Sequence, residues 1–335
     1  MIQAQGHDAF AALRRIGEGW WAGFLSYDLG RAVERVPNKN PATSVPDLAF
    51  VRFDRQLTVD DTPGASPCGI GPIHWRSSLD RDAYTTAVHT IHEHLLAGNC
   101  YQVNLTRLLT TAARLDPFAL FYALRTHNPA PHEAFVEIGD VAVVSASPEC
   151  FLRVDGRHVT TRPIKGTSAE PEHLRASAKD RAENVMIVDL ARNDLGRVCE
   201  YGSVHVSALC TIEPHPGLYH LVSTVEGRLR EDTTIADVIR ATFPPASVTG
   251  CPKPRVMQII EDLEPARRGA YCGAIGFIDA DRGICDLNVA IRTFTITPHG
   301  TTFGVGGGIV ADSDPQAEWD ETELKARRLL AIAGG

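Results

Sequence analysis

The sequence predicts an α+β protein built on large antiparallel β-sheets. Segments with strand character arrive in pairs joined by tight turns, at Gly139-Asp140, Asp155-Gly156 and 281–283, and they do not alternate with helices. The chain has 335 residues, of which 44% are apolar, so it can bury one large core or two modest ones. A parallel sheet of repeated strand-helix-strand units is therefore not expected.

The individual elements follow from local patterns. Residues 19–36 read as a strand followed by a helical stretch, and residues 39–78, rich in Pro, Asp, Ser and Gly, read as a loop or exposed connector. Helical periodicity over 81–99 ends at Gly98-Asn99, which suits a C-cap. The remaining expected elements are a half-buried strand at 100–112, a helix at 117–127, two hairpins within 134–167, with Lys165 at the end of a strand, a long helix at 171–193, a strand at 218–230, a helix at 253–262, a hairpin over 271–296, and a last strand before a helix from Pro315.

Charge and composition exclude several classes of protein. The net charge of −8 and the lack of a basic stripe argue against nucleic-acid binding. No apolar run reaches membrane-spanning length and the first residues lack the pattern of a secretory signal, so we expect a cytoplasmic protein that does not enter a membrane. Eight cysteines stand singly with no CxxC pair, which predicts reduced thiols rather than a zinc site.

Lys165 lies in the stretch TRPIKGTS, between a proline and a glycine. Pro163 fixes its own φ angle and Gly166 permits unusual backbone angles, so the lysine is held on a constrained piece of chain. No other charge stands directly beside it, unlike a lysine on a solvated face. Taken alone, the octapeptide is compatible either with a turn lysine or with a functional amine.

Two pairs of acidic residues lie on expected helices. Asp180 and Glu183, and likewise Glu318 and Glu321, are three residues apart, which places each pair on one helical face. A solvated face paired with nearby lysines and arginines is one interpretation. The other is a Mg²⁺ site, since this ion prefers oxygen ligands and the second pair follows the glycine run at 306–308, where backbone amides can approach a ligand.

Arg292 stands in the apolar segment NVAIRTF, where an unpaired guanidinium would be costly. Its planar fork matches the geometry of a carboxylate, so it is a candidate for binding an anionic substrate. An ion pair with a distant acid is the alternative. Tyr271 and the glycines of GAIG are similarly open to a binding role or to simple strand packing.

Eight segments in order resemble the chorismate-utilising enzymes, and more narrowly the branch of anthranilate synthase and aminodeoxychorismate synthase component I. They are YQVNLT, SPECFL, RPIKGT, AENVMIVDLARNDLG, FPPASVTGCPKPRVMQII, YCGAIGFID, NVAIRT and VGGGIVADSDPQAEWDETELKAR. The resemblance covers roughly residues 75–332, and it implies a β-sandwich flanked by helices. It also implies a chorismate-binding catalytic domain at 75–332, with residues 1–74 as a strand-rich part of the same fold that ends in a connector.

The resemblance further implies roles for individual residues. Glu183 and Glu321 resemble the direct ligands of Mg²⁺, with Asp180 and Glu318 supporting through water. Glu149 of SPEC resembles the general acid that protonates the leaving C4 hydroxyl, and Lys165 of PIKGT the nucleophile that adds to C2 of chorismate. The expected substrate-binding groups and the histidine of the site are Arg292, Tyr271, Gly273, Gly276, Gly306, Gly307, Gly308, Thr167 and His220.

Lys165 and Gln102 set the expected reaction within the family. Anthranilate synthases generally have alanine in place of this lysine, and isochorismate and salicylate synthases have a lysine in place of Gln102 to activate water. The resemblance thus implies amination of chorismate to 4-amino-4-deoxychorismate, the precursor of 4-aminobenzoate and folate. Ammonia would come from a separate glutamine amidotransferase subunit, because no segment of this chain resembles one.

Other hypotheses stay open at this point. The chain could make anthranilate or 2-amino-2-deoxyisochorismate, or it could be a non-catalytic member that kept the fold. Its N-terminal part is shorter than in many relatives, and no segment matches the tryptophan pocket of feedback-regulated anthranilate synthases. Regulation by tryptophan is therefore not expected.

Overall fold

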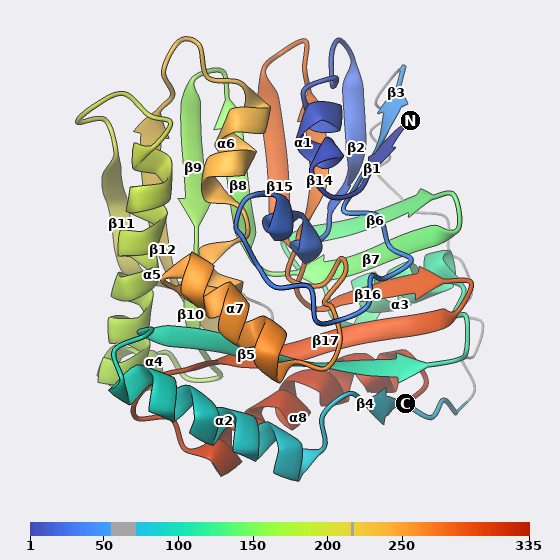
Figure 1. Cartoon of the computed structure of the whole chain (residues 1–335), viewed down its shortest axis with the longest axis vertical. Helices are drawn as coiled ribbons and strands as arrows, with labels where there is room; N and C mark the ends of the chain where they lie inside the picture. Colours follow the sequence, from blue (N-terminus) through green and yellow to red (C-terminus); the bar gives the residue numbers. More distant parts are fainter. Residues whose placement is uncertain (55–71, 216–217) are drawn as a thin grey trace.

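The computed structural model describes residues 1–54, 72–215 and 218–335, and its two antiparallel sheets confirm the α+β prediction (Figure 1). The larger sheet has ten strands and the smaller has seven. In Figure 1 the strands of the ten-stranded sheet run vertically, whereas those of the seven-stranded sheet run across the view.

The ten-stranded sheet joins segments that are far apart in the sequence, because β2 near the N-terminus pairs with β14. β10 lies at one end of the strand order and β11 pairs with β12 beside it. Its strands are, in spatial order, β1 (Ile2–Ala4), β3 (Leu48–Phe53), β2 (Trp20–Leu25), β14 (Ala274–Asp279), β15 (Ile284–Val289), β8 (Cys150–Asp155), β9 (His158–Arg162), β12 (Leu218–Arg228) and β10 (Ile164–Ser168), with β11 (His205–His215).

The seven-stranded sheet is centred on the long pair of β5 and β17. In spatial order its strands are β13 (Gly250–Cys251), β5 (Gln102–Thr111), β17 (Gly300–Ile309), β16 (Thr293–Thr297), β7 (Val141–Ser147) and β6 (His132–Ile138), and β4 (Arg76–Ser77) pairs with β5. The helices are α1 (Asp8–Leu13), α2 (Arg81–Leu96), α3 (Pro117–His127), α4 (Pro171–Ala176), α5 (Ala178–Gly196), α6 (Ile235–Thr242), α7 (Lys253–Leu263) and α8 (Pro315–Ile332), with 3₁₀ helices η1 (Tyr27–Ala32) and η2 (Ala246–Val248).

Buried apolar clusters hold the layers together. Phe24 of β2, Val143 of β7 and Ile275 of β14 share one cluster, so the two sheets pack against each other there. Helices α1, α5 and α6 contribute to the cluster on the ten-stranded sheet, while α3 and α8 pack on the seven-stranded sheet around the stacked rings of Phe294 and Phe303. Burial of this apolar surface is the main force that stabilises the fold.

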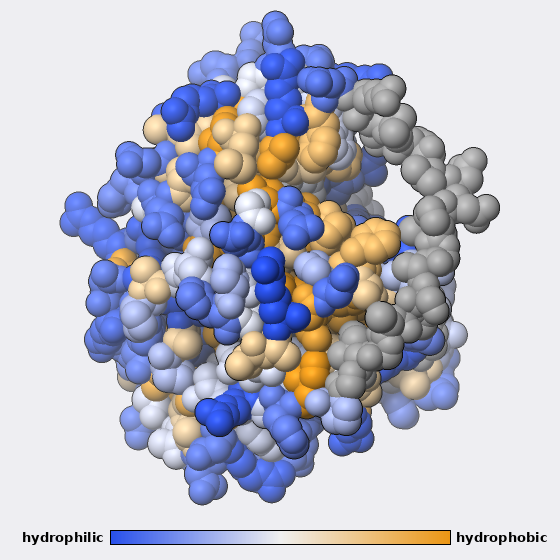
Figure 2. All heavy atoms as spheres, turned by 90° about the vertical axis from the view of Figure 1, so that its right-hand side faces the viewer, coloured by the Kyte–Doolittle hydropathy of each residue, from blue (hydrophilic) through white to orange (hydrophobic). Residues whose placement is uncertain are grey.

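The face shown in Figure 2 is mainly hydrophilic, and its apolar residues gather in a central strip rather than spread over the surface. None of the helices within the described ranges is long and apolar enough to cross a membrane.

Two of the connections between the two sheets are short and lie next to each other. The first joins β7 to β8 through Pro148 and Glu149, and the second joins β15 to β16 through residues 290–292. The amide of Val289 donates a hydrogen bond to the carbonyl of Glu149 (2.9 Å), and the hydroxyl of Ser147 donates one to the carbonyl of Val289 (2.6 Å). These crossings therefore lie side by side at the junction of the sheets.

Most expected elements are confirmed, including both turn pairs and the helix at 117–127. Five expectations were wrong in part. The segment 39–78 contains β3 and β4, and the part of it at 55–71 lies outside the described residues. The helix expected at 171–193 is divided at Ser177, whose hydroxyl accepts a hydrogen bond from the Asp180 amide and caps α5.

The other three corrections concern strands. β5 is buried on both faces at its start rather than half-buried, because its polar residues meet buried partners; the amide and hydroxyl of Thr106 both donate to Glu264 (2.8 and 2.9 Å). Arg292 lies at the crossing after β15 rather than inside a strand, with φ at +52°. Finally, Lys165 lies within a strand of its own, β10, and not at the end of the preceding one.

Candidate active site

Glu149 lies at the first crossing between the sheets and is 4% exposed. Burial raises the pKa of its carboxyl to about 7, while a hydrogen bond from Ser247, the nearby charge of Lys165 and the backbone of Ile164 act in the opposite direction. A carboxyl with this pKa is populated in its neutral form near neutral pH. Glu149 can therefore donate a proton, which is the chemical requirement for a general acid.

Lys165 projects from β10 into the same interior, and its side chain is 11% exposed. Burial lowers its pKa, and the carboxylates of Glu183 and Glu149 counter that effect. Its Nζ lies 3.8 Å from Oε2 of Glu183. The turn-lysine interpretation does not fit this setting, because the amine is buried between two acids rather than solvated.

His220 of β12 stands beside the same strand. Its Nδ1 lies 2.8 Å from the hydroxyl of Thr167, which belongs to β10, and Thr167 and His220 are register partners. The ring is 1% exposed, and burial together with Arg292 and His215 lowers its pKa to about 3. Among the described groups its Nε2 has no hydrogen-bond partner, so a neutral imidazole presents a free nitrogen to the interior.

Three of the four predicted metal ligands lie near one another although they come from two helices far apart in sequence: burial raises the pKa of Glu183, and the charges of Asp180 and Glu318 raise it further. Lys179 of α5 lies 3.3 Å from Oε1 of Glu318 and 4.0 Å from Oε1 of Glu183, so it connects the two acidic pairs. Lys325 lies 2.6 Å from Oε1 of Glu321. The predicted solvated-face alternative is wrong for Glu318, which is 4% exposed and accepts a hydrogen bond from Ser313 (2.7 Å).

The acidic cluster fits a Mg²⁺ ion that keeps part of its water shell. Within the described ranges no three acidic, histidine or cysteine side chains stand together as a complete metal site. Two direct carboxylate ligands, water and a substrate carboxylate would complete the coordination that Mg²⁺ prefers. Lys179 already holds a positive charge between Glu183 and Glu318, which shows that this position favours a cation.

Arg292 is a half-buried cation whose charge acts on His220. Burial and the charge of Arg328 lower its pKa, and no carboxylate of the described chain forms an ion pair with it. The predicted alternative of a structural ion pair is therefore not observed. A left-handed backbone at a residue other than glycine is sparsely populated, and it holds the guanidinium at the crossing.

Tyr271 precedes β14 and is 6% exposed. Its ring lies directly over Gly304 of β17, where a Cβ atom would come within 2.1 Å of the ring carbon Cδ1. Burial raises the pKa of its hydroxyl well above the usual value. It is therefore a neutral phenol placed between the two sheets.

The predicted glycines have different surroundings. A Cβ atom at Gly273 would lie 2.0 Å from the carbonyl oxygen of Leu25, and one at Gly276 would lie 2.0 Å from that of Asp286, so both permit close approach of strands. In β17, the carbonyl of Gly306 accepts a hydrogen bond from Lys325 (2.9 Å). Their contact with a substrate stays a prediction.

Gly307 and Gly308 bring two groups of side chains to the same strand. A Cβ atom at Gly307 would lie 3.0 Å from Oε2 of Glu318, and one at Gly308 would lie 1.9 Å from Nε2 of Gln102 and 3.0 Å from Nζ of Lys165. Gln102 is fully buried, and neither atom of its amide has a partner among the described residues. An unsatisfied buried amide beside the lysine suits a polar ligand.

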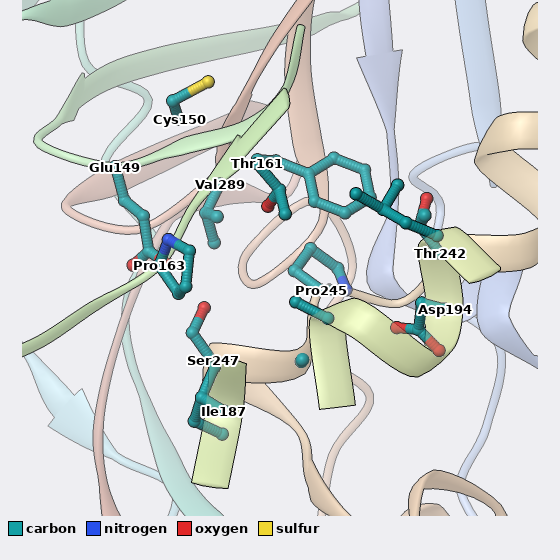
Figure 3. A pocket seen from close by; sticks show the side chains of 14 residues that line it. Glu149, Cys150, Thr161, Pro163, Ile187, Asp194, Thr242, Pro245, Ser247 and Val289 are labelled. Carbon is teal, nitrogen blue, oxygen red and sulfur yellow. The ribbon is translucent and has the colours of Figure 1, made fainter. Parts of the chain in front are cut away.

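A small pocket adjoins Glu149. Figure 3 shows Glu149 and Ser247 toward one end, and Asp194 of α5 with Thr242 of α6 toward the other. Its walls between them are mainly apolar, with Phe151, Ile187 and Leu195 among them. Water that reaches the acid from this side would meet few polar groups.

Sequence reasoning missed the groups that support the predicted ones. Ser247 and Lys179 both act on predicted residues, and neither was assigned a role. Ser247 lies in the FPPASVTG segment, so the motif itself was a signal for it. Lys179 was noted only as a partner of a solvated face.

Comparison with known proteins agrees with this arrangement. The profile of the chorismate binding enzyme family matches residues 2–331. The chain is 42% identical over 342 residues to aminodeoxychorismate synthase component 1 of Klebsiella aerogenes, covering 92% of this chain and 76% of the relative. It is 38% identical over 355 residues to anthranilate synthase component 1 of Thermus thermophilus, covering 93% and 77%.

A solved structure shows the same fold. Anthranilate synthase component I from Streptococcus pneumoniae superimposes with a TM-score of 0.81 at 28% identity, over 94% of this chain and 81% of the other. The family profile spans nearly the whole chain, and two relatives exceed 30% identity over most of their length. The chain therefore belongs to the family of chorismate binding enzymes.

Proposed function

We propose that this protein aminates chorismate to 4-amino-4-deoxychorismate, with Lys165 as a nucleophile at C2. The observation that carries the proposal is the buried lysine of β10, held between Glu183 and Glu149 with a lowered pKa. Lowering the pKa increases the fraction of neutral amine, which is the form that can attack carbon. The relatives named aminodeoxychorismate synthase component 1 support the same reaction.

The first step would form a bond from Nζ of Lys165 to C2 of chorismate. As the electrons of the diene shift, the bond from C4 to its hydroxyl breaks. Glu149 gives its proton to that oxygen, which leaves as water, and the acid becomes a carboxylate. Near pH 7 a carboxyl with a pKa of about 7 can exist in both of these forms.

In the second step ammonia would attack C4 while the bond between C2 and Lys165 breaks. The electrons return along the diene and the lysine leaves as a neutral amine. The carboxylate of Glu149 can then take the extra proton from the new ammonium group. Both residues thereby return to their starting forms, and the net change is chorismate plus ammonia to 4-amino-4-deoxychorismate plus water.

The remaining groups would bind and orient the substrate. Arg292, which lacks an acidic partner in the described chain, would pair with the enolpyruvyl carboxylate, and the Tyr271 hydroxyl would donate to it. Mg²⁺ held by Glu183 and Glu321 would supply positive charge to the ring carboxylate when bound. His220 would offer its free Nε2 near the reacting ring.

Ammonia would be supplied by a glutamine amidotransferase subunit. The relatives are named component 1, which supports a separate partner component, and no nucleic acid or membrane partner is proposed. A cytoplasmic enzyme that supplies 4-aminobenzoate synthesis, and so folate, fits this reaction.

The decisive experiment uses the purified chain with chorismate and Mg²⁺. Without ammonia, the intact mass is expected to rise by chorismate minus one water, with the added mass on the peptide that contains Lys165. With excess ammonium, 4-amino-4-deoxychorismate should form. Lys165→Ala should lose the adduct and most of the rate, although direct attack by ammonia can leave some, while Lys39→Ala at an exposed position should match the parent.

Anthranilate synthesis is the second candidate, because anthranilate synthases are also among the similar proteins. Formation of anthranilate and pyruvate from chorismate and ammonia would favour it and contradict the proposed reaction. 2-Amino-2-deoxyisochorismate as the released product would indicate amination at C2 rather than C4. Mass and chromatography of the product separate all three outcomes.

A further inference from the structure

Asn184 and Ser223 form a fully buried polar pair behind the active site. The hydroxyl of Ser223 donates to Oδ1 of Asn184, and Nδ2 of Asn184 donates to the carbonyl of Leu221 (3.1 Å). Asn184 follows Glu183 directly on α5, and Leu221 follows His220 directly on β12. The pair therefore fixes the helix that carries Glu183 against the strand that carries His220.

Ser223 also forms hydrogen bonds with two further segments of the chain. Its amide donates to the carbonyl of Pro163 (3.1 Å), two residues before Lys165. Its hydroxyl accepts a hydrogen bond from the amide of Cys210 in β11 (2.8 Å). Ser223 is thus bonded to α5, to Pro163 just before β10, and to β11, and the loss of any of these bonds would remove a partner from a buried polar group.

β11 adopts an unusual conformation at this contact. Its register with β12 shifts twice, between Val206 and Ala208 and again between Ala208 and Thr211. Cys210 lies within the second shift and has φ at +52°. A left-handed cysteine costs free energy and persists only where surrounding contacts hold it. The hydrogen bond from its amide to Ser223 is one of these contacts, and its thiol lies 3.7 Å from Oδ1 of Asn184.

We infer that Asn184 and Ser223 are positioning residues that set the placement of Glu183 relative to Lys165 and His220. Neither is among the residues that line the pocket beside Glu149. Their bonds instead join α5, which carries Glu183, to β12, which carries His220, and to Pro163, two residues before Lys165. Because the side-chain amide of Asn184 has two fixed partners, it sets the rotation of α5 about its axis. That rotation determines where the carboxylate of the preceding residue, Glu183, points.

The inference rests on the proposed function only for what these groups do, not for how they are held. Ser223→Ala removes the hydroxyl, leaves the amide of Cys210 unpaired, and leaves Oδ1 of Asn184 with only the Cys210 thiol at 3.7 Å. The matched control is Thr301→Val at the far end of β17, where a buried hydroxyl likewise has two backbone partners, Ala113 and Leu115 (2.8 and 3.2 Å). Both variants lose comparable hydrogen bonds, but only one is next to the site.

Three quantities would be measured on parent, Ser223→Ala and Thr301→Val. They are the melting temperature, the rate at which an amine reagent labels Lys165 in metal-free protein at one pH, and kcat and KM for chorismate with ammonium. We expect Ser223→Ala to change the labelling rate at least fivefold and to lower kcat at least tenfold, with KM within threefold of the parent. Thr301→Val should lower the melting temperature similarly and leave the other two unchanged.

A purely structural role is the outcome that overturns the inference: Ser223→Ala would then melt earlier while its labelling rate and kcat stay within twofold of the parent. If Ser223→Ala does not fold, Ser223→Cys, whose thiol hydrogen-bonds more weakly, is judged by the same thresholds. Should the parent itself fail to aminate chorismate, the proposed function fails, and the labelling comparison still decides the inference alone.

Discussion

Glu149 shows how one residue combines a chemical role with a cost to stability. Its carboxyl is buried at the crossing between the sheets, and that burial raises its pKa to about 7. The same environment that keeps a proton on the acid near neutral pH disfavours the charged form. Activity and stability should therefore both depend on pH through this group.

The pH dependence of activity is the first prediction. The proton that Glu149 donates is present below a pH of about 7 and is lost as the pH rises through that value. The parent's kcat/KM for chorismate, corrected for the concentration of free ammonia, should therefore fall above about pH 7. Glu149→Gln should lower kcat by about 10²–10⁴-fold and abolish the falling limb. If kcat/KM of the variant still fell above about pH 7, the fall would be due to another ionisable group.

The stability of the same variant gives the second prediction. The pKa of Glu149 is raised from 4.5 to about 7, so the folded protein binds this proton more tightly than the unfolded chain. The stabilisation that comes from this tighter proton binding is complete below pH 4.5, declines as the pH rises to 7, and does not change at higher pH. At pH 8 Glu149→Gln should raise the free energy of unfolding by up to about 3 kcal/mol. Denaturant unfolding at pH 5 and pH 8 measures it, and an equal effect at both would contradict the argument.

At the scale of elements, β17 lets two sets of side chains approach one strand. Because Gly308 has no Cβ atom, the amide of Gln102 and the amine of Lys165 can lie against its backbone. A methyl group there would collide with Gln102 Nε2 at 1.9 Å. The missing side chain is thus part of the site.

Gly308→Ala should displace Gln102 and Lys165 and lower kcat by about 10²-fold, since a shift of about 1 Å can cost that much. Gly196→Ala is the control, because a Cβ at this helical glycine would meet nothing within 4 Å. Steady-state kinetics of both variants test the prediction. A Gly308→Ala enzyme with the parent's rate would show that these side chains do not need their present positions.

Helices α5, α6 and α7 are joined by one buried ion pair. Nζ of Lys253 lies 2.5 Å from Oδ2 of Asp194 and donates to the carbonyl of Thr242 (2.6 Å). Lys253→Met would leave Asp194 as a buried charge without its partner and should destabilise the fold by about 3–5 kcal/mol. Lys253→Met with Asp194→Leu should lose clearly less in a urea titration. An additive double variant would show that the two residues do not interact.

At the scale of the whole molecule, local features could be predicted from the sequence, but which of them lie side by side in the folded chain could not. The turn pairs at 139–140 and 155–156 and the spacing of Glu318 and Glu321 depend on neighbouring residues, so the sequence revealed them. β11 was missed because nearly all of its residues are exposed or half-buried, with Cys210 alone buried, so its sequence lacks a strongly apolar face.

The crossing at Arg292 was missed for a different reason. The apolar run NVAIRTF reads as one strand, yet the chain changes sheets within it. Only the order of strands in both sheets shows where this happens. The same holds for Lys179, whose position between two helices depends on how they pack and not on its neighbours in the chain.

Because groups from both sheets form the site, a bound substrate should stabilise the molecule as a whole. Lys165 and His220 belong to the ten-stranded sheet, and Gln102 to the seven-stranded one. Chorismate with Mg²⁺ at 100 times the dissociation constant should stabilise the fold by about 2.7 kcal/mol, read as a rise in melting temperature.

Two variants separate the stabilisation that comes from Mg²⁺ from the stabilisation that comes from chorismate. Glu183→Gln should remove the part that depends on Mg²⁺, and Arg292→Met the part that depends on chorismate, because each removes a charge that the ligand would neutralise. Exposed Glu172→Gln, which lies on α4, should respond like the parent. If Glu183→Gln kept the full response to Mg²⁺, the ion would bind elsewhere, and the two acidic pairs would be a lysine-bridged structural contact between α5 and α8.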